Sequence, residues 1–308
     1  MSTVTSTAPA AERTGYGPRG RSPWLDIDWR AYQRWVEIDG RPVNVIDIGS
    51  GDAEPIVFVH GLAGSWQNWL EQIPVFARER RVVALDLPGF GASPMPRDQI
   101  TISGYARIVN ELCEALGLGT IVLVGNSMGG FVSAELAIDR PERVARLVLV
   151  SAAGITSENL ALARAIPLLR ATQTGLVMIT GWVATHSDTV VRRRALRRAT
   201  MRAVVAHPNR LPAPLVTEQL RGSGKPGFID AFYALTHYAI RDRLARIAVP
   251  TLILWGDRDQ LVPTRDAFVF EALIPDSRLV IYEDTGHVSM LERPERFNAD
   301  VEAFLAQD

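Results

Sequence analysis

The chain has 308 residues, 47% of them hydrophobic, and its 33 Lys and Arg residues nearly balance its 34 Asp and Glu residues. This length and apolar content indicate a globular protein with a large core. The net charge of −1 gives no indication of binding to nucleic acid or to an anionic membrane surface.

Cysteine and histidine usage argues against a metal centre. Cys113 is the single cysteine, so an internal disulfide is excluded, and its place in the helical pattern IVNELCEALG favours a small buried side chain. There is no cluster of Cys and His suited to zinc and no acidic loop suited to calcium. We therefore expect neither a metal nor a cofactor.

The N-terminal region has Arg, Gly and Pro but lacks the continuous apolar segment of a secretory signal. We interpret residues 1–28 as a mobile tail and expect a cytoplasmic protein. The most apolar later stretch, residues 175–184, is too short to span a bilayer and contains Thr180, so stable membrane insertion is not expected.

Alternating runs at residues 35–39 and 42–48, joined at Asp39-Gly40, predict a β-hairpin. Continuous apolar runs then predict buried strands, and helical patterns separate most of them. This alternation predicts right-handed crossovers and a mainly parallel sheet. The predicted strands are residues 55–59, 81–85, 121–124 and 146–150, and the predicted helices are residues 65–77, 101–116 and 128–139.

The alternation stops after Ser151 and resumes at Pro250, with strands predicted at 251–255 and 279–282 and helices around 265–273 and 294–306. Between them the patterns are helical. We predict an α/β core made of residues 29–154 and 241–308, with a helical cap inserted at residues 155–240. Such an insertion is expected over the carboxyl edge of the sheet, where ligands bind in open α/β sheets.

Residues 120–131, TIVLVGNSMGGF, read as a strand that turns sharply into a helix at Ser127. This is the G-x-S-x-G pattern of a nucleophile elbow. A strained backbone would project the Ser127 hydroxyl out of the turn, and Gly125 and Gly129 avoid collisions there.

Acyl transfer by a serine also needs a base, an acid that orients the base, and N–H donors for the oxyanion. The base candidate is His287, since His60 fits the oxyanion loop better and His186, His207 and His237 fall in the insertion. Asp259 is the acid candidate and Asp257 its alternative. Serine, acid and histidine in this chain order suit the fold class.

Two backbone amides are candidates for the oxyanion hole. Met128 follows the nucleophile at the start of a helix, whose dipole favours negative charge. Leu62 lies in HGLAGS, where Gly61 and Gly64 allow a close approach to the substrate.

The motifs HGLAGS, DLPGFGAS, GNSMGG, WGDRDQLVP and DTGHVSM resemble those of α/β-hydrolase-fold serine hydrolases with a helical cap, over about residues 43–305. The resemblance implies Ser127 as nucleophile, His287 as base, and Asp259 as acid because it matches the WG-x-x-D spacing. It also implies that the Leu62 and Met128 amides form the oxyanion hole.

Branches of this family differ in ways that the sequence can weigh. Ser127 argues against dehalogenases and epoxide hydrolases, which use an aspartate at the elbow. C–C bond hydrolases of ring-cleavage products often carry GNSMGG, but they resemble one another in a glycine-richer oxyanion loop and a Trp after the histidine, where this chain has Val288. A carboxylesterase is therefore the first interpretation, C–C hydrolysis the second, and a non-catalytic ligand receptor the third.

The insertion offers two features that bear on the substrate. A basic helical stretch is interpreted as a solvated face, with recognition of a substrate carboxylate as the alternative. The apolar residues 165–184 are expected to pack mostly on the core, with some lining an acyl pocket. The expected partner is a small uncharged ester, and no oligomeric state is indicated. The basic residues are Arg192, Arg193, Arg194, Arg197, Arg198 and Arg202.

Overall fold

The computed structural model describes residues 15–156 and 173–307. Its centre is an eight-stranded sheet with the strand order β1-β2-β4-β3-β5-β6-β7-β8. The β1–β2 and β2–β4 pairs are antiparallel and the others are parallel, which confirms the predicted mainly parallel sheet. The strands are β1 (Gln33–Ile38), β2 (Arg41–Ile48), β3 (Ile56–Val59), β4 (Val82–Leu85), β5 (Ile121–Asn126), β6 (Val144–Val150), β7 (Thr251–Gly256) and β8 (Ser277–Tyr282).

Asp39 and Gly40 form the predicted hairpin turn between β1 and β2. Ile38 pairs with Arg41, so the loop has two residues, and both have positive φ, at 51° and 65°. Two positive φ values in a two-residue loop define a type I′ turn, whose twist matches that of the strands.

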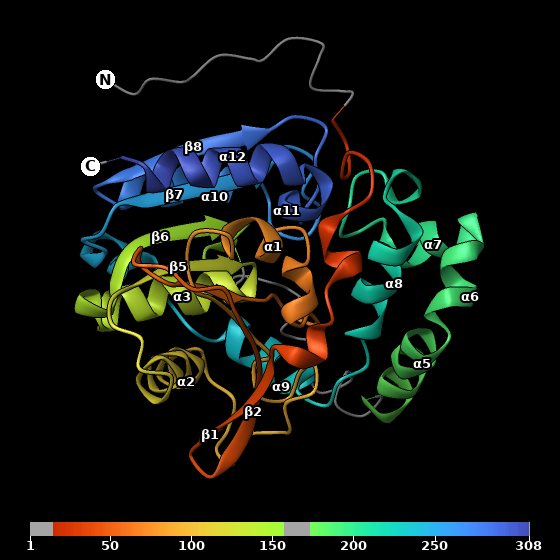
Figure 1. Ribbon diagram of the computed structural model, residues 1–308, viewed down its shortest axis with the longest axis horizontal. Coiled ribbons are helices and arrows are strands. Elements are labelled where there is room, and N and C mark those ends of the chain that lie inside the picture. The colour runs from red at the N-terminus through yellow and green to blue at the C-terminus, as the bar shows by residue number, and fades with distance from the viewer. Residues whose placement is uncertain (1–14, 157–172, 308) are drawn as a thin grey trace.

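Helices cover both faces of the sheet (Figure 1). Val57 and Val59 of β3 belong to one buried cluster together with residues of α2, α3 and α10, whereas Ile56 and Phe58 belong to a second cluster with residues of α1 and α12. Because successive strand residues point to opposite faces, a strand buried on both sides reads as a continuous apolar run. These helices are α1 (Ile73–Phe76), α2 (Ile102–Ala115), α3 (Met128–Asp139), α10 (Arg265–Leu273), α11 (Ser289–Glu292) and α12 (Pro294–Leu305).

The helix predicted over residues 65–77 is in fact two short pieces, a 3-10 helix at Trp66–Trp69 and α1. Pro74 lies in the first turn of α1. Since proline lacks the N–H for an intrahelical bond and clashes with the preceding turn, a helix starts at such a residue more readily than it runs through it.

The structure corrects the mobile tail predicted for residues 1–28. Residues 1–14 lie outside the described part, but the segment from residue 15 onward packs on the core. Tyr16 and Trp24 are only 8% and 7% exposed, and Ser22 Oγ and Trp24 Nε1 donate hydrogen bonds to Glu71 Oε1 at 2.7 and 2.8 Å. Burial of two aromatic side chains offsets the entropy lost on ordering the segment.

The described elements between β6 and β7 are helical, as predicted. Figure 1 shows α5 to α8 beyond the arrowheads of β5, β6 and β8, whereas α9 lies nearer to α2. Residues of α9 share the buried cluster of α2 and α3. The bounds are α5 (Gln173–Thr185), α6 (Ser187–Arg192), α7 (Arg194–Met201), α8 (Ala213–Arg221) and α9 (Phe228–Thr236).

Packing of the apolar stretch 165–184 on the core was predicted, and its residues 165–172 lie outside the described part. Three side chains of α5 contradict that prediction, since Met178, Ile179 and Trp182 are 69%, 66% and 53% exposed. A helix that is apolar all round is ordinarily a buried helix, so these exposed side chains depart from the usual pattern. No helix in the described part is long and apolar enough to cross a bilayer.

The basic stretch has a mainly solvated face, but one arginine differs. Arg197 is buried, and its guanidinium donates a hydrogen bond to the carbonyl oxygen of Leu211. Burial lowers its pKa. Arg192, Arg193, Arg194, Arg198 and Arg202 are exposed.

Candidate active site

The elbow places Ser127 between β5 and α3 with φ 56° and ψ −117°, a backbone conformation that L residues rarely adopt. Three backbone hydrogen bonds hold it. The Ser127 N–H donates to Val150 O at 2.9 Å, and its carbonyl accepts from the N–H groups of Phe131 and Ala153, each at 3.1 Å. These hydrogen bonds from the surrounding backbone therefore hold Ser127 in its strained conformation.

Neighbouring backbone atoms lie so close to the elbow that both Gly125 and Gly129 must be glycine. A Cβ at Gly129 would overlap the carbonyl oxygen of Val59 at the end of β3, and a Cβ at Gly125 would overlap the carbonyl oxygen of Gly129. A larger residue at Gly129 would push the elbow away from β3, and one at Gly125 would push α3 away from β5.

The loops after β7 and β8 bring Asp259 and His287 together. Asp259 Oδ2 lies 2.7 Å from His287 Nδ1, and their side chains are 0% and 5% exposed. The second carboxylate oxygen accepts from the N–H groups of Leu261 and Val262, both at 2.9 Å. Since the carboxylate engages Nδ1, the ring nitrogen left for a serine hydroxyl is Nε2.

The alternative acid, Asp257, takes a different position. It is exposed, and its Oδ1 accepts from the N–H of Thr285 at 3.1 Å. Asp257 thus braces the loop that carries His287, while Asp259 meets the imidazole.

The other histidines have partners elsewhere. His207 Nε2 lies 2.8 Å from Asp284 Oδ1. His186 and His237 stack on Trp182 and Tyr233, with ring centroids 4.6 and 4.0 Å apart.

Asn126, directly before Ser127, links the elbow to the histidine loop, and the sequence analysis did not single it out. Its Nδ2 donates to Val150 O at 3.1 Å and to His287 O at 3.3 Å. It is a buried amide at the end of an apolar strand. A polar residue in that place was the available indication, because buried polar groups need partners.

The HGLAGS loop lies against the elbow. A Cβ at Gly61 would be 3.0 Å from the Ser127 Cβ, so the backbone leading to Leu62 passes directly beside the serine. Met128 is the first residue of α3, and the first N–H groups of a helix have no intrahelical acceptor. Both predicted oxyanion donors therefore lie on backbone adjacent to Ser127.

His60 and Asp86 hold this loop in place. His60 Nε2 accepts from the Leu87 N–H at 2.9 Å, so Nδ1 carries the proton and donates to Gly61 O at 2.7 Å. Burial lowers the pKa of His60, which favours this neutral form. Asp86 accepts from the Trp66 N–H at 2.8 Å and fixes the loop's far end.

Comparisons with known proteins identify the family of the chain. The alpha/beta hydrolase fold family matches residues 54–294. The chain is 31% identical over 278 residues to the dihydrolipoyllysine-residue acetyltransferase component of the acetoin cleaving system of Cupriavidus necator, covering 87% of this chain and 67% of that protein. It is 29% identical over 286 residues to the 2-hydroxy-6-oxo-6-(2'-aminophenyl)hexa-2,4-dienoic acid hydrolase of Metapseudomonas resinovorans, covering 89% and 91%.

Among solved structures, the esterase EaEST from Exiguobacterium antarcticum superposes with a TM-score of 0.71 at 25% identity, covering 89% of this chain and 99% of the esterase. The family match spans well over half of the chain and includes the elbow, the Asp259 loop and the His287 loop. The chain belongs to the alpha/beta hydrolase fold family.

Proposed function

We propose that this protein is a serine hydrolase that cleaves a carboxylic ester of a mainly apolar, uncharged substrate through an acyl-enzyme. The observation that carries the proposal is the buried 2.7 Å contact between His287 Nδ1 and Asp259 Oδ2. The strained elbow of Ser127 is joined to the same loop by Asn126, which donates to His287 O at 3.3 Å. Nucleophile, base and orienting acid are the parts that acyl transfer requires.

In the proposed mechanism the Ser127 Oγ attacks the ester carbonyl while His287 Nε2 takes its proton. The N–H groups of Leu62 and Met128 donate to the oxyanion of the tetrahedral intermediate. His287 then protonates the departing alkoxide, and the alcohol leaves. A water that gives its proton to His287 attacks the acyl-enzyme, and the carboxylic acid departs as Ser127 regains its proton.

Two relatives bear on the substrate. EaEST is described as an esterase, which supports ester hydrolysis. The Metapseudomonas relative acts on a dienoic acid, which supports the second candidate, hydrolysis of a C–C bond in a vinylogous diketone. Val288 after the histidine is the residue that favours the ester.

The test is a panel of p-nitrophenyl esters from acetate to palmitate, measured beside a ring-cleavage dienoate. Wild type is compared with Ser127→Ala and with Ser133→Ala, which removes a buried hydroxyl from the same helix. We expect Ser127→Ala to lower ester kcat by about 10⁴-fold or more, and Ser133→Ala to retain activity.

Rapid loss of the dienoate absorbance with weak ester turnover would replace the ester proposal by C–C hydrolysis. Ester turnover that persists in Ser127→Ala would contradict the proposed nucleophile. Ligand binding without turnover of either substrate would favour a receptor.

A further inference from the structure

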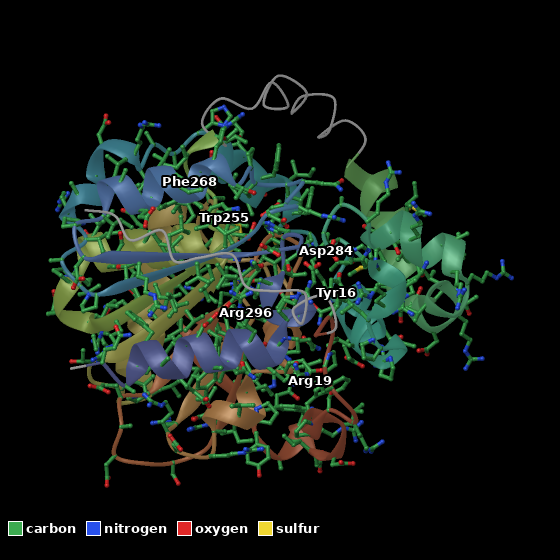
Figure 2. The ribbon with its side chains drawn as sticks, turned by 90° about the horizontal axis from the view of Figure 1, so that it is seen from above. Tyr16, Arg19, Trp255, Phe268, Asp284 and Arg296 are labelled. Atoms are coloured by element: carbon green, nitrogen blue, oxygen red, sulfur yellow. The ribbon has the colours of Figure 1, made fainter. Side chains whose placement is uncertain are left out.

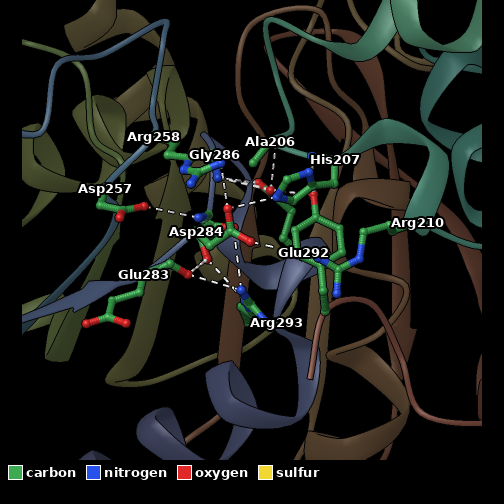
Figure 3. A network of polar contacts seen from close by, with 12 residues as sticks. Ala206, His207, Arg210, Asp257, Arg258, Glu283, Asp284, Gly286, Glu292 and Arg293 are labelled. Carbon is green, nitrogen blue, oxygen red and sulfur yellow. Dashed lines mark hydrogen bonds and ion pairs between the residues drawn. The ribbon is translucent and has the colours of Figure 1, made fainter. Parts of the chain in front are cut away.

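Glu292, the last residue of α11, carries a carboxylate that is completely buried and touches three separate parts of the chain (Figure 3). Tyr16 Oη donates to Oε2 at 2.6 Å, and the Ala206 N–H donates to the same oxygen at 2.9 Å. The Gly286 N–H lies 3.0 and 2.9 Å from the two oxygens. These donors come from the N-terminal segment, the insertion and the residue directly before His287.

The loop that ends in His287 is held between Glu292 and the insertion. The His287 N–H donates to Val204 O at 2.9 Å. A Cβ on Gly286 would lie 2.8 Å from Ala206 N and 3.0 Å from Glu292 Oε1, so no side chain fits there. His287 therefore follows any movement of this loop, and its 2.7 Å contact with Asp259 depends on the loop position.

The N-terminal segment around Tyr16 and Gly17 completes this network of hydrogen bonds. The Gly17 N–H donates to Glu292 O at 2.7 Å, and the His207 N–H donates to Tyr16 Oη at 2.8 Å. Tyr16 and Asp284 lie between the core and the cap helices in Figure 2. The segment thus connects α11 to the insertion at the point where both meet the histidine loop.

Several charged groups surround the Glu292 carboxylate. Arg293 and Arg210 lie over the Tyr16 ring, at 5.1 and 4.8 Å from its centroid. Asp284, two residues before Gly286, pairs with His207 at 2.8 Å and with Arg258 at 2.7 Å. Burial raises the pKa of the Glu292 carboxyl to about 7, against the opposing effect of its hydrogen bonds.

We propose that Glu292 is a positioning residue for His287 and that Tyr16 completes its site, so that full turnover requires the ordered N-terminal segment. Glu292 binds the Gly286 N–H and thereby keeps the His287 imidazole in contact with Asp259. This inference rests on the proposed function, in which His287 is the base.

The experiment compares Glu292→Gln and Tyr16→Phe with wild type. Tyr282→Phe is the matched control, because it removes another tyrosine hydroxyl that donates to a carboxylate, here Asp300 on α12 at 2.7 Å. A 1 Å displacement of a catalytic group costs about 100-fold in rate, so we expect Glu292→Gln to lower kcat by roughly 10–100-fold with KM little changed. Tyr16→Phe lowers kcat less, and Tyr282→Phe leaves it at the wild-type level.

Reaction with an alkyl fluorophosphonate gives a readout that needs no natural substrate. The Ser127 Oγ–P bond forms, the P–F bond breaks, fluoride leaves, and the serine proton passes to His287. The rate of phosphonylation should fall in Glu292→Gln and Tyr16→Phe in proportion to kcat. Tyr16→Phe retains the Glu292 carboxylate and so tests the inference even if Glu292→Gln folds poorly.

The pH profile separates positioning from general stability. In wild type the acid limb of kcat should include protonation of Glu292 near pH 7, because a protonated carboxyl has one oxygen fewer to accept hydrogen bonds from Tyr16 and the Ala206 and Gly286 N–H groups. Glu292→Gln should lack this protonation step. If Glu292 only stabilised the fold, its replacement would lower the melting temperature but would not remove a protonation step from the pH profile.

Amide exchange of the His287 N–H is measured in parallel, since it is independent of catalysis. Faster exchange in both variants, with slower phosphonylation, supports the inference. Wild-type exchange and phosphonylation rates in Glu292→Gln would overturn it. A wild-type protein that does not react with the probe would refute the proposed function instead, and His287 exchange would still decide whether Glu292 holds the loop.

Discussion

The loops at the carboxyl ends of the strands and the helices inserted between β6 and β7 are held by different means. The loops after β5 and β7 continue from strands that are buried along their length, and Asp259 in the second loop binds backbone through two N–H groups. The insertion instead leaves Met178, Ile179 and Trp182 of α5 facing solvent. The sheet therefore builds the site geometry.

Hydrogen bonds join the insertion to the core at a few residues, and these residues lie next to the loops of the candidate site. Gln219 of α8 accepts from Asn68 Nδ2 at 2.6 Å and donates to Gln67 O at 2.9 Å, directly after the HGLAGS loop. Val204 binds the His287 N–H on the other side. We infer from this comparison that the insertion acts on the proposed site through these few contacts. Five changes test the site, its packing and its junction with the insertion.

The largest effect is expected at the acid. Asp259→Asn should lower kcat by about 10³–10⁴-fold, because an amide facing Nδ1 favours the wrong imidazole tautomer. Asp257→Asn removes only a contact to the Thr285 N–H and should cost far less. Steady-state kinetics on both variants decide this, and similar losses would reverse the assignment.

Gly129→Ala tests the close packing of the elbow. The added methyl overlaps Val59 O, so we expect a loss of roughly 3 kcal/mol in the free energy of unfolding. Gly119→Ala is the control, since a Cβ there meets nothing within 4 Å. Urea unfolding measures both, and equal stabilities would contradict a tightly packed elbow.

Gln219→Leu tests the main junction between insertion and core. Loss of its two hydrogen bonds should cost about 1–3 kcal/mol, and KM should rise more than kcat falls. Glu218→Gln, one residue earlier, removes the charge of a partly buried carboxylate that pairs with the half-exposed Arg221, and should cost less than about 1 kcal/mol. An unchanged KM in Gln219→Leu would show that this junction does not contribute to substrate binding.

Burial of the His60 imidazole predicts that the stability of the protein depends on pH. Its pKa is lowered in the folded state from 6.5 by burial, so below pH 6.5 the unfolded chain binds a proton that the folded chain does not. The free energy of unfolding should therefore fall with decreasing pH, by at most about 1.4 kcal/mol per pH unit for one proton. His60→Leu should remove this contribution, and an unaltered slope between pH 6.5 and 5 would exclude it.

The smallest expected effect is a gain in the free energy of unfolding. Gly181 lies inside α5, and a Cβ there meets nothing within 4 Å. Gly181→Ala should stabilise the protein by about 0.5–1 kcal/mol, because alanine loses less backbone entropy in a helix. A loss of stability in thermal unfolding would show that α5 packs more closely than its exposed side chains indicate.

The sequence by itself determined the features that depend on local sterics and periodicity. The parallel strands, the turn at Asp39-Gly40 and the elbow at Ser127 are each specified within a few residues, and the fold class predicted from them is confirmed. The choice between Asp257 and Asp259 rested on resemblance to a family spacing. The residues alone left it open, since both follow the same strand.

Only the tertiary structure decided the contacts between distant segments. Tyr16 and Glu292 are 276 residues apart, and Gly- and Arg-rich sequence around Tyr16 had the character of a mobile tail. Arg197 is buried although its neighbours in the basic stretch are exposed. Burial depends on which surfaces meet once the chain has folded, and no local pattern in the sequence specifies the partner of a side chain so far away.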